Sequence, residues 1–227
     1  MTSPDVASTT VGLPARRSSN GPVRRAPAAR IHEALGAKIT LESAWELPAS
    51  YGDVEGERAL LREGIAVADI TARGKVDVRG RIDDLLRTAP GLGLVARVAD
   101  DWALVLSGPG GEAQIRSRLE RAAGPSAMVT DATHLYAGYA LAGPGLPDAL
   151  ARLTGWDPAT LAPGDSAGAP IAEVRAVVVR RDLELPVLEV YVATELARYA
   201  WEELLAIARS LGGGPAGWDA LRAEGWS

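Results

Sequence analysis

The chain repeats one order of predicted elements twice, and this repeat limits the fold more than any other feature of the sequence. Each copy reads as a strand, a turn, a helix, a hairpin and a second helix. The glycines that open the first helix of each copy, Gly80 and Gly143, lie 63 residues apart, which indicates one supersecondary unit copied once rather than a solenoid of short units. The hairpins have short turns, whereas parallel strands need long crossovers. We therefore expect an α+β fold of two pseudo-repeated βαββα units with antiparallel sheets.

The local patterns of the two copies match in order. The first copy runs through GKVDVRG, RIDDLLRT, VARVADDWALVLS and EAQIRSRLERA. The second copy runs through YAGYALAG, LPDALARLTG, EVRAVVVRRDLELPVLEVYVA and TELARYAWEELLAIARS. In the last helix, Thr194 is the expected N-cap, and the apolar stripe consists of Leu196, Ala200, Leu204 and Ile207.

The repeat also sets the expected domain boundaries. Residues 1–29 mix Ser, Thr, Pro and Arg without periodicity, so we expect a disordered N-terminal tail, which we favour over a transit peptide. One duplicated domain is expected over residues 30–222, with a first repeat at about 65–122 and a second at about 128–210.

Composition excludes several classes of function. The net charge of −5 disfavours a nucleic-acid or acidic-membrane partner. The chain has no cysteine, so thiolate catalysis and Cys-ligated metals are excluded, and with only His32 and His134 we expect no metal site. No apolar run reaches the ~18 residues of a membrane span. The cytoplasm is the expected compartment.

Three stretches then carry a resemblance to a known family. In order they are HEALGAKITLESAWELPASY, EGERALLREGIAVADITARGKVDVRG and VTDATHLYAGYALAGPGLPDALARLTG. They resemble signature stretches of the glycine cleavage system T-protein, the tetrahydrofolate-dependent aminomethyltransferase, over roughly residues 31–222. The wider family includes the gamma subunit of heterotetrameric sarcosine oxidase. The resemblance implies a duplicated folate-binding body with a central channel for the pterin, and transfer of a one-carbon unit to tetrahydrofolate.

The chain also departs from the family pattern. Ala72 and Arg73 stand where the family has His and Met, and the passage that supplies the T-protein's key aspartate is missing between Gly80 and Val95. RIDDLL resembles that passage only superficially and by position belongs to the helix after Gly80, so catalysis by Asp83 or Asp84 is disfavoured and no catalytic residue is assigned. The short first half and the lack of the family's C-terminal barrel indicate a short form similar to the sarcosine oxidase gamma subunit.

The resemblance indicates four cofactor-binding candidates. A pterin needs a carboxylate that accepts two N–H groups in one plane, and RRDLELPVLEVYV resembles the family strand that supplies it, with Glu184 and Glu189 as candidates. The two are five apart and would face opposite sides of an uninterrupted strand, so the register stays open. Tyr136 could line the channel, and Arg73 could meet a glutamyl carboxylate; core packing and solvation are the alternatives.

Other polar residues are expected to have structural roles. A turn or cap is favoured for Asp131, and an ordinary histidine role for His134, since no nucleophile signature accompanies it. Tyr139 should face away from Tyr136 and pack in the core. The stretch GPGGEAQIR lacks the lysine of a phosphate loop and is expected to be a strand-to-helix turn.

Two functional hypotheses remain. The first is a tetrahydrofolate-binding protein of the aminomethyltransferase type that acts in one-carbon transfer, with folate, a one-carbon donor or a glycine-cleavage protein as its partner. The second is a non-catalytic structural subunit of a sarcosine-oxidase-like flavoprotein complex, with a larger oxidoreductase as its partner. The missing aspartate passage favours the second hypothesis, and the well-matched N-terminal stretch favours the first.

Overall fold

The computed structural model describes residues 22–88, 91, 93–157, 160–181 and 183–226. The strands are β1 (Arg24–Arg25), β2 (Lys38–Glu42), β3 (Trp45–Ser50), β4 (Ala66–Asp69), β5 (Arg73–Gly80), β6 (Leu94–Ala99), β7 (Trp102–Pro109), β8 (Ala127–Asp131), β9 (Tyr136–Ala142), β10 (Ser166–Ile171), β11 (Val174–Arg180), β12 (Val187–Ala193) and β13 (Gly214–Pro215). The α-helices are α1 (Ala29–Ala34), α2 (Val54–Glu63), α3 (Ile82–Thr88), α4 (Glu112–Ala123), α5 (Leu146–Leu153), α6 (Ala197–Ser210) and α7 (Trp218–Ala223).

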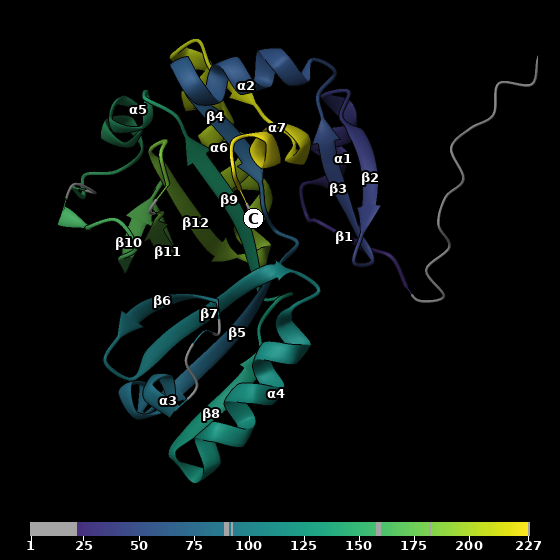
Figure 1. The fold of residues 1–227 in the computed structure, drawn as a ribbon. Helices are drawn as coiled ribbons and strands as arrows, with labels where there is room; N and C mark the ends of the chain where they lie inside the picture. The colour runs from purple at the N-terminus through teal and green to yellow at the C-terminus, as the bar shows by residue number, and fades with distance from the viewer. Residues whose placement is uncertain (1–21, 89–90, 92, 158–159, 182, 227) are drawn as a thin grey trace, which may run out of the picture.

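The chain forms two lobes, which Figure 1 shows one above the other. The smaller lobe holds a four-stranded antiparallel sheet in the order β6-β7-β5-β8. The larger lobe holds a six-stranded sheet in the order β10-β11-β12-β9-β4-β13, with a three-stranded sheet, β1-β3-β2, at its side. The lobes join where β4 runs into β5.

The predicted unit is present in the smaller lobe and, with one additional strand, in the larger lobe. The smaller lobe runs β5-α3-β6-β7-α4, and the larger runs β9-α5-β10-β11-β12-α6, in which β10 is the additional strand. In each unit the hairpin returns its last strand next to the first strand, antiparallel to it, as β7 does beside β5 and β12 beside β9. The predicted α+β fold with two antiparallel repeats is confirmed.

The strand pairings differ from the expected repeat boundaries. β4 lies within the stretch assigned to the first repeat, but it pairs with β9 in the larger sheet, from Ala66 opposite Ala142 to Asp69 opposite Tyr139. In the smaller sheet the corresponding place beside β5 is filled by β8. Periodicity identifies a strand but not its partner, so these pairings could not be predicted from the pattern alone.

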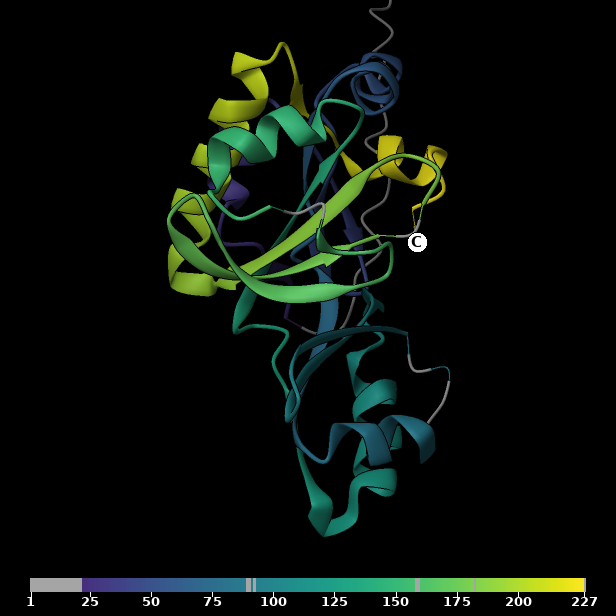
Figure 2. The ribbon, with the colours of Figure 1, turned by 90° about the vertical axis from the view of Figure 1, so that its left-hand side faces the viewer.

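Helices cover the outer face of each sheet. In the smaller lobe, α3 and α4 pack on the face of β5 and β7 that carries Val76, Val78 and Val105. In the larger lobe, α5 and α6 pack on the face of β9 and β12 that carries Tyr139 and Leu188. Helix α7 lies on the other side of this sheet from α6, as Figure 2 shows.

The inner faces of the two sheets share a third cluster. It joins Leu104 and Leu106 of β7 to Val177 of β11, Val187 of β12 and Ala140 of β9. Successive strand residues point to opposite faces, so one residue in two of β5 and β12 points into this layer between the lobes. Arg73 and Lys75 of β5, and Val187, Glu189 and Tyr191 of β12, occupy these positions.

The N-terminal boundary also differs from the expectation. Of the predicted tail 1–29, residues 1–21 lie outside the described residues, while Arg24 and Arg25 pair with Trp45 and Glu46 as strand β1. Ala28 is fully buried. The prediction of disorder therefore does not hold for residues 24–29.

The stretch from residue 32 to residue 51 has no single period because it combines different elements. It contains the end of α1 and the hairpin β2-β3. The hairpin turns at Ser43 and Ala44, whose φ values of 48° and 65° lie in the left-handed region that two-residue hairpin turns use. The Trp-Glu-Leu-Pro portion lies in β3, which leads toward α2.

Two further expectations about helix starts are resolved. The stretch GPGGEAQIR is a strand-to-helix turn, as predicted, because β7 ends at Pro109 and α4 begins at Glu112. The start of α6 differs: Thr194 and Leu196 form a 3-10 turn ahead of the helix, and the Thr194 hydroxyl donates to His134 O at 2.7 Å instead of capping the helix. Leu196 is partly exposed.

Candidate polar site between the lobes

Two charged side chains from different lobes meet in the layer between the sheets. Arg73 begins β5 in the smaller lobe, and Glu189 is the third residue of β12 in the larger lobe. Both point inward, and Arg73 Nη1 donates to Glu189 Oε1 at 2.8 Å. The Glu189 side chain is 0% exposed and the Arg73 side chain 5% exposed, so water screens this ion pair very little.

The Glu189 carboxylate has two further partners. Arg181 Nη1 also donates to Oε1, and the Tyr191 hydroxyl donates to Oε2. Burial, and then the nearby Glu189, raise the pKa of Tyr191 well above its usual value, so the phenol stays protonated and remains a donor. Both carboxylate oxygens are therefore engaged within the chain.

Positive charge exceeds negative charge at this point. Two guanidinium groups, of Arg73 and Arg181, face the one carboxylate of Glu189. The buried Nε of Arg73 has no hydrogen-bond partner among the described residues. The Arg181 guanidinium also lies over the ring of Trp226, 5.3 Å from the ring centroid, which holds it beside Glu189.

Lys75 lies on the same face of β5, two residues beyond Arg73. Its ammonium donates to Thr71 O at 2.7 Å and to Arg73 O at 2.8 Å. Burial lowers the pKa of Lys75 from 10.5 to about 7. The carbonyl groups thus hold the Nζ atom in place, while the surroundings disfavour its charge.

A second buried polar group lies at the end of β4. His32 Nε2 lies 2.7 Å from Asp69 Oδ2, and the Tyr51 hydroxyl lies 2.8 Å from His32 Nδ1. Burial, with Asp69 as the next cause, raises the pKa of Tyr51, so the phenol keeps its proton. Asp69 Oδ1 also accepts from Thr71 N at 2.8 Å. This chain of hydrogen bonds ties α1 and the residue that follows β3 to the turn between the lobes.

The sequence-derived candidates fall into two groups. Arg73, Tyr136 and Glu189 all lie on inner faces, although Arg73 bonds to Glu189 and not to an outside carboxylate. Glu184 lies in the turn between β11 and β12, outside both strands, and is exposed. The open question of register is thereby answered, because the strand holding Glu189 begins only at Val187.

The residues expected to have structural roles do so. Tyr139 faces away from Tyr136 and donates to Ala197 O at 2.7 Å. Asp131 Oδ1 accepts from Thr133 N at 3.0 Å in a turn at the end of β8. The exposed His134 stacks on Trp45 with 5.4 Å between ring centroids.

The two aspartates of RIDDLL lie on the surface of the smaller lobe. Asp83 pairs with Arg97, and Asp84 pairs with Arg81 and Arg87. The Asp83 side chain is 79% exposed. Neither carboxylate is part of the buried group around Glu189.

Sequence reasoning missed His32, Asp69, Lys75 and Arg181 as members of the buried polar groups. The signal for two of them was present, since Asp69 and Lys75 interrupt otherwise apolar strand patterns in IAVADITARGKVDV. A charge inside such a pattern needs a buried partner. Among the described residues, no group of three or more His, Asp or Glu is placed to hold a metal ion.

The site does not fit a pterin as it is arranged. A pterin would need the free edge of a carboxylate, but three donors already occupy the oxygens of Glu189.

None of the described helices is long and apolar enough to cross a membrane.

Comparison with known proteins defines the class of this fold. The chain is similar to the crystal structure of glycine cleavage system aminomethyltransferase T from Bartonella henselae, with a TM-score of 0.75 and 19% identity over 89% of this chain and 62% of that one. It is also similar to a chain of the heterotetrameric sarcosine oxidase from Corynebacterium sp. U-96, with a TM-score of 0.62 and 15% identity over 84% of this chain and 97% of that one. The fold is that of these proteins.

Curated relatives point to one family more specifically. An aminomethyltransferase of Parafrankia sp. is 28% identical over 251 residues, and one of Streptomyces coelicolor is 28% identical over 241 residues. These matches cover 90% and 91% of this chain but 64% of each relative. No family model matches the chain. The resemblance to the aminomethyltransferase family is confirmed, and the chain spans slightly less than two thirds of these relatives.

Proposed function

We propose that this chain is a non-catalytic relative of the aminomethyltransferases, which serves as a structural subunit of a larger one-carbon enzyme. The observation that carries the proposal is the occupied carboxylate of Glu189, whose oxygens already accept from Arg73, Arg181 and Tyr191. An incoming pterin would have to displace a guanidinium from a buried ion pair, which costs about 3–5 kcal/mol when one partner is lost. In this proposal, the ion pairs and the hydrogen bond of Glu189 serve to hold the two lobes together.

The similarity to the oxidase chain supports the same proposal. The similarity spans 97% of a chain from a heterotetrameric oxidase. This fold thus has a counterpart within a multi-subunit enzyme. The partner we propose is a larger flavin-containing oxidoreductase, and the compartment we propose is the cytoplasm, since the chain has no cysteine for disulfides.

Direct binding of tetrahydrofolate is the second candidate. It is favoured by the sequence similarity to aminomethyltransferases and by the position of Glu189 between the two lobes. In this case Arg73 would leave Glu189, and the pterin N–H groups would take its place. Since Arg73 stands where the related family has Met, Arg73→Met is the substitution that would open the site.

The two candidates differ in a binding experiment. Tetrahydrofolate is protected from oxidation under nitrogen and titrated into the purified chain and into its variants Arg73→Met and Arg79→Met. The heat of binding is measured by calorimetry. Arg79 is an exposed arginine on the same strand and serves as the control. We expect no saturable heat with the unmodified chain or with Arg79→Met up to high micromolar ligand. Saturable binding to the unmodified chain would contradict the structural role.

The partner is tested separately. The tagged chain is expressed in its native host and isolated at low salt, and the eluate is measured for flavin absorbance and for mass by light scattering. We expect a stoichiometric complex with a flavin-containing protein. A chain that elutes alone, without flavin, at all salt concentrations would overturn the proposed subunit role.

A further inference from the structure

A cavity lies on the outer face of the larger sheet, between α5 and strands β11 and β12. Its volume of about 470 Å³ falls within the range of roughly 300–1,000 Å³ that is typical of small-molecule sites. Leu188 lines this cavity, while its neighbour Glu189 points to the inner face. The sheet therefore separates the cavity from the polar site between the lobes.

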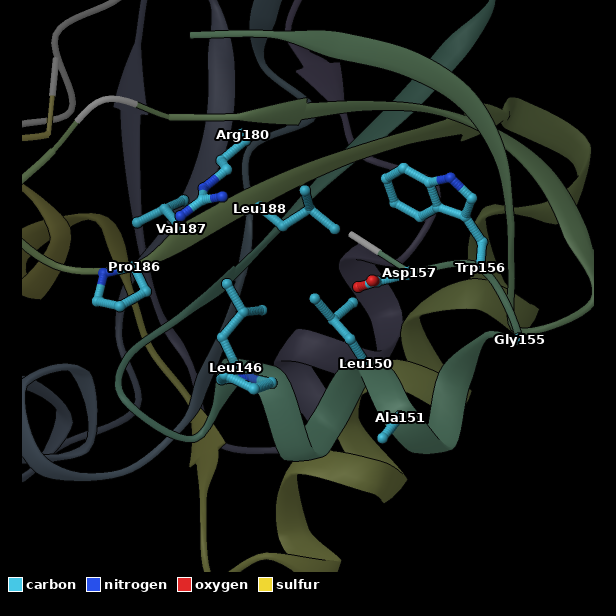
Figure 3. A pocket seen from close by; sticks show the side chains of 11 residues that line it. Leu146, Leu150, Ala151, Gly155, Trp156, Asp157, Arg180, Pro186, Val187 and Leu188 are labelled. Carbon is cyan, nitrogen blue, oxygen red and sulfur yellow. The ribbon is translucent and has the colours of Figure 1, made fainter. Parts of the chain in front are cut away.

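Apolar side chains form most of the cavity wall, as Figure 3 shows. Leu146 and Leu150 of α5 face Leu188 of β12, and the indole ring of Trp156 closes one end. The leucines also belong to the buried cluster under α5 and α6. A hydrocarbon or aromatic group that enters this space removes apolar surface from water, which favours its binding.

One cation reaches the cavity at the end opposite Trp156. Arg180 is the last residue of β11, and its Nη1 donates to Leu161 O at 2.6 Å. The backbone at Arg180 is fixed as well, because its N–H donates to Asp165 O at 2.9 Å. No carboxylate of the described residues pairs with this guanidinium, which has five N–H donors and uses one of them on the carbonyl.

We propose that this cavity binds a small apolar carboxylic acid, with its carboxylate on Arg180 and its hydrocarbon or aromatic part against Leu146, Leu188 and Trp156. Arginine is suited to this role because its planar N–H groups match a carboxylate. The carboxylate of Asp157 reaches the cavity beside Trp156, at the end away from Arg180. The anionic group of the ligand thus lies at the Arg180 end.

The proposal is tested with two probes of the same shape. The acid 4-phenylbutyrate and its neutral amide 4-phenylbutanamide are titrated into the full chain, and binding is followed by saturation-transfer NMR and by the shift in Tm. We expect saturable binding of the acid at least tenfold tighter than that of the amide. Equal affinities would overturn the assignment of Arg180, and no saturable binding of either probe would overturn the site.

Variants separate the two parts of the site. Arg180→Met should reduce affinity for the acid about tenfold without changing affinity for the amide, whereas Arg175→Met, an exposed arginine on the same strand, should change neither. Ala151 is an exposed residue at the cavity rim. Ala151→Trp should block both probes, and Ala151→Ser should block neither. Full binding by a folded Ala151→Trp chain would contradict the location.

This site is independent of the proposed subunit role. Tetrahydrofolate titrations and flavin co-purification report on the layer between the lobes, while the phenylbutyrate titration reports on the outer face under α5. Failure of one proposal therefore leaves the other testable by its own measurement.

Discussion

Arg73 and Glu189 form an ion pair at 2.8 Å across the two lobes, with both side chains buried. Glu189→Gln would remove the only carboxylate that faces Arg73 and Arg181 among the described residues. We expect a loss of about 3–5 kcal/mol in the free energy of unfolding, because two guanidinium groups would stay buried without a counter-charge. Urea denaturation followed by circular dichroism measures this loss.

The control for that substitution is Glu184→Gln. Glu184 is exposed in the turn before β12, so Glu184→Gln should change the free energy of unfolding by no more than about 0.5 kcal/mol. A similarly small loss in the free energy of unfolding for Glu189→Gln would mean that the ion pair between the lobes contributes little to stability.

Lys75 should make stability depend on pH. Its folded pKa is lowered to about 7, from 10.5 in the unfolded chain. Between these two values the unfolded state binds more protons, so the free energy of unfolding should rise as pH increases from 7 toward 9. Below pH 7 both states are protonated and this contribution is constant. The size of the rise is of the order of a few kcal/mol.

The measurement compares Lys75→Met with the unmodified chain by urea denaturation at intervals from pH 6 to pH 9. Lys38 is the only other lysine and is exposed, so Lys38→Met is the matched control. The rise should vanish in Lys75→Met and persist in Lys38→Met. A rise of the same size in all three proteins would assign it to other groups.

His32 should contribute far more to stability than His134. His32→Ala removes the partners of Tyr51 and Asp69 and the edge contact with Trp201, whose ring centroid lies 4.5 Å away. We expect a loss of about 2–4 kcal/mol, since the buried Asp69 carboxylate would lose a donor and a cavity would form. Thermal unfolding measures it.

His134→Ala is the control because the chain has these two histidines and the side chain of His134 is exposed. Its loss should remain below about 1 kcal/mol, limited to the stacking on Trp45. Equal losses for the two histidines would contradict the described network.

Gly138 is required for the close approach of β9 to the Tyr191 ring. A Cβ atom at Gly138 would lie 2.8 Å from Tyr191 Cε1 and 3.3 Å from Ile70 Cγ1. Gly138→Ala should therefore cost about 1–3 kcal/mol through overpacking. At Gly168 the nearest atom, Val98 Cγ1, lies 3.4 Å away, so Gly168→Ala should change stability by less than about 1 kcal/mol. Chemical denaturation of both variants checks the difference.

Much of the fold could be predicted because alternation and helical periodicity are local properties. The hairpin of β6 and β7, and helix α6 with its stripe through Ala200 and Leu204, follow directly from the pattern. The pairing of β4 with β9 could not be predicted, since it depends on which sheet has room for another strand.

The candidate site was predicted only in part for a related reason. Arg73 and Glu189 were identified through the family resemblance, but they lie 116 residues apart and only the packing of the two lobes joins them. The resemblance indicates that each residue contacts a folate ligand, whereas in the structure the two side chains bind each other. The role of Lys75 depends on burial, which no sequence window reports.

The pairing of β4 with β9 makes the smaller lobe an insertion. The chain leaves the larger sheet after Asp69 and returns to it at Tyr136, and Asp69 lies opposite Tyr139 in the same sheet. The smaller lobe is thus one continuous segment, while the larger lobe is assembled from two separate segments. A gene fragment beginning at β9 would lack an internal strand of its own sheet, and excision of the smaller lobe would carry Arg73 away and leave Glu189 behind. The polar site is accordingly a property of the complete molecule and of neither lobe alone.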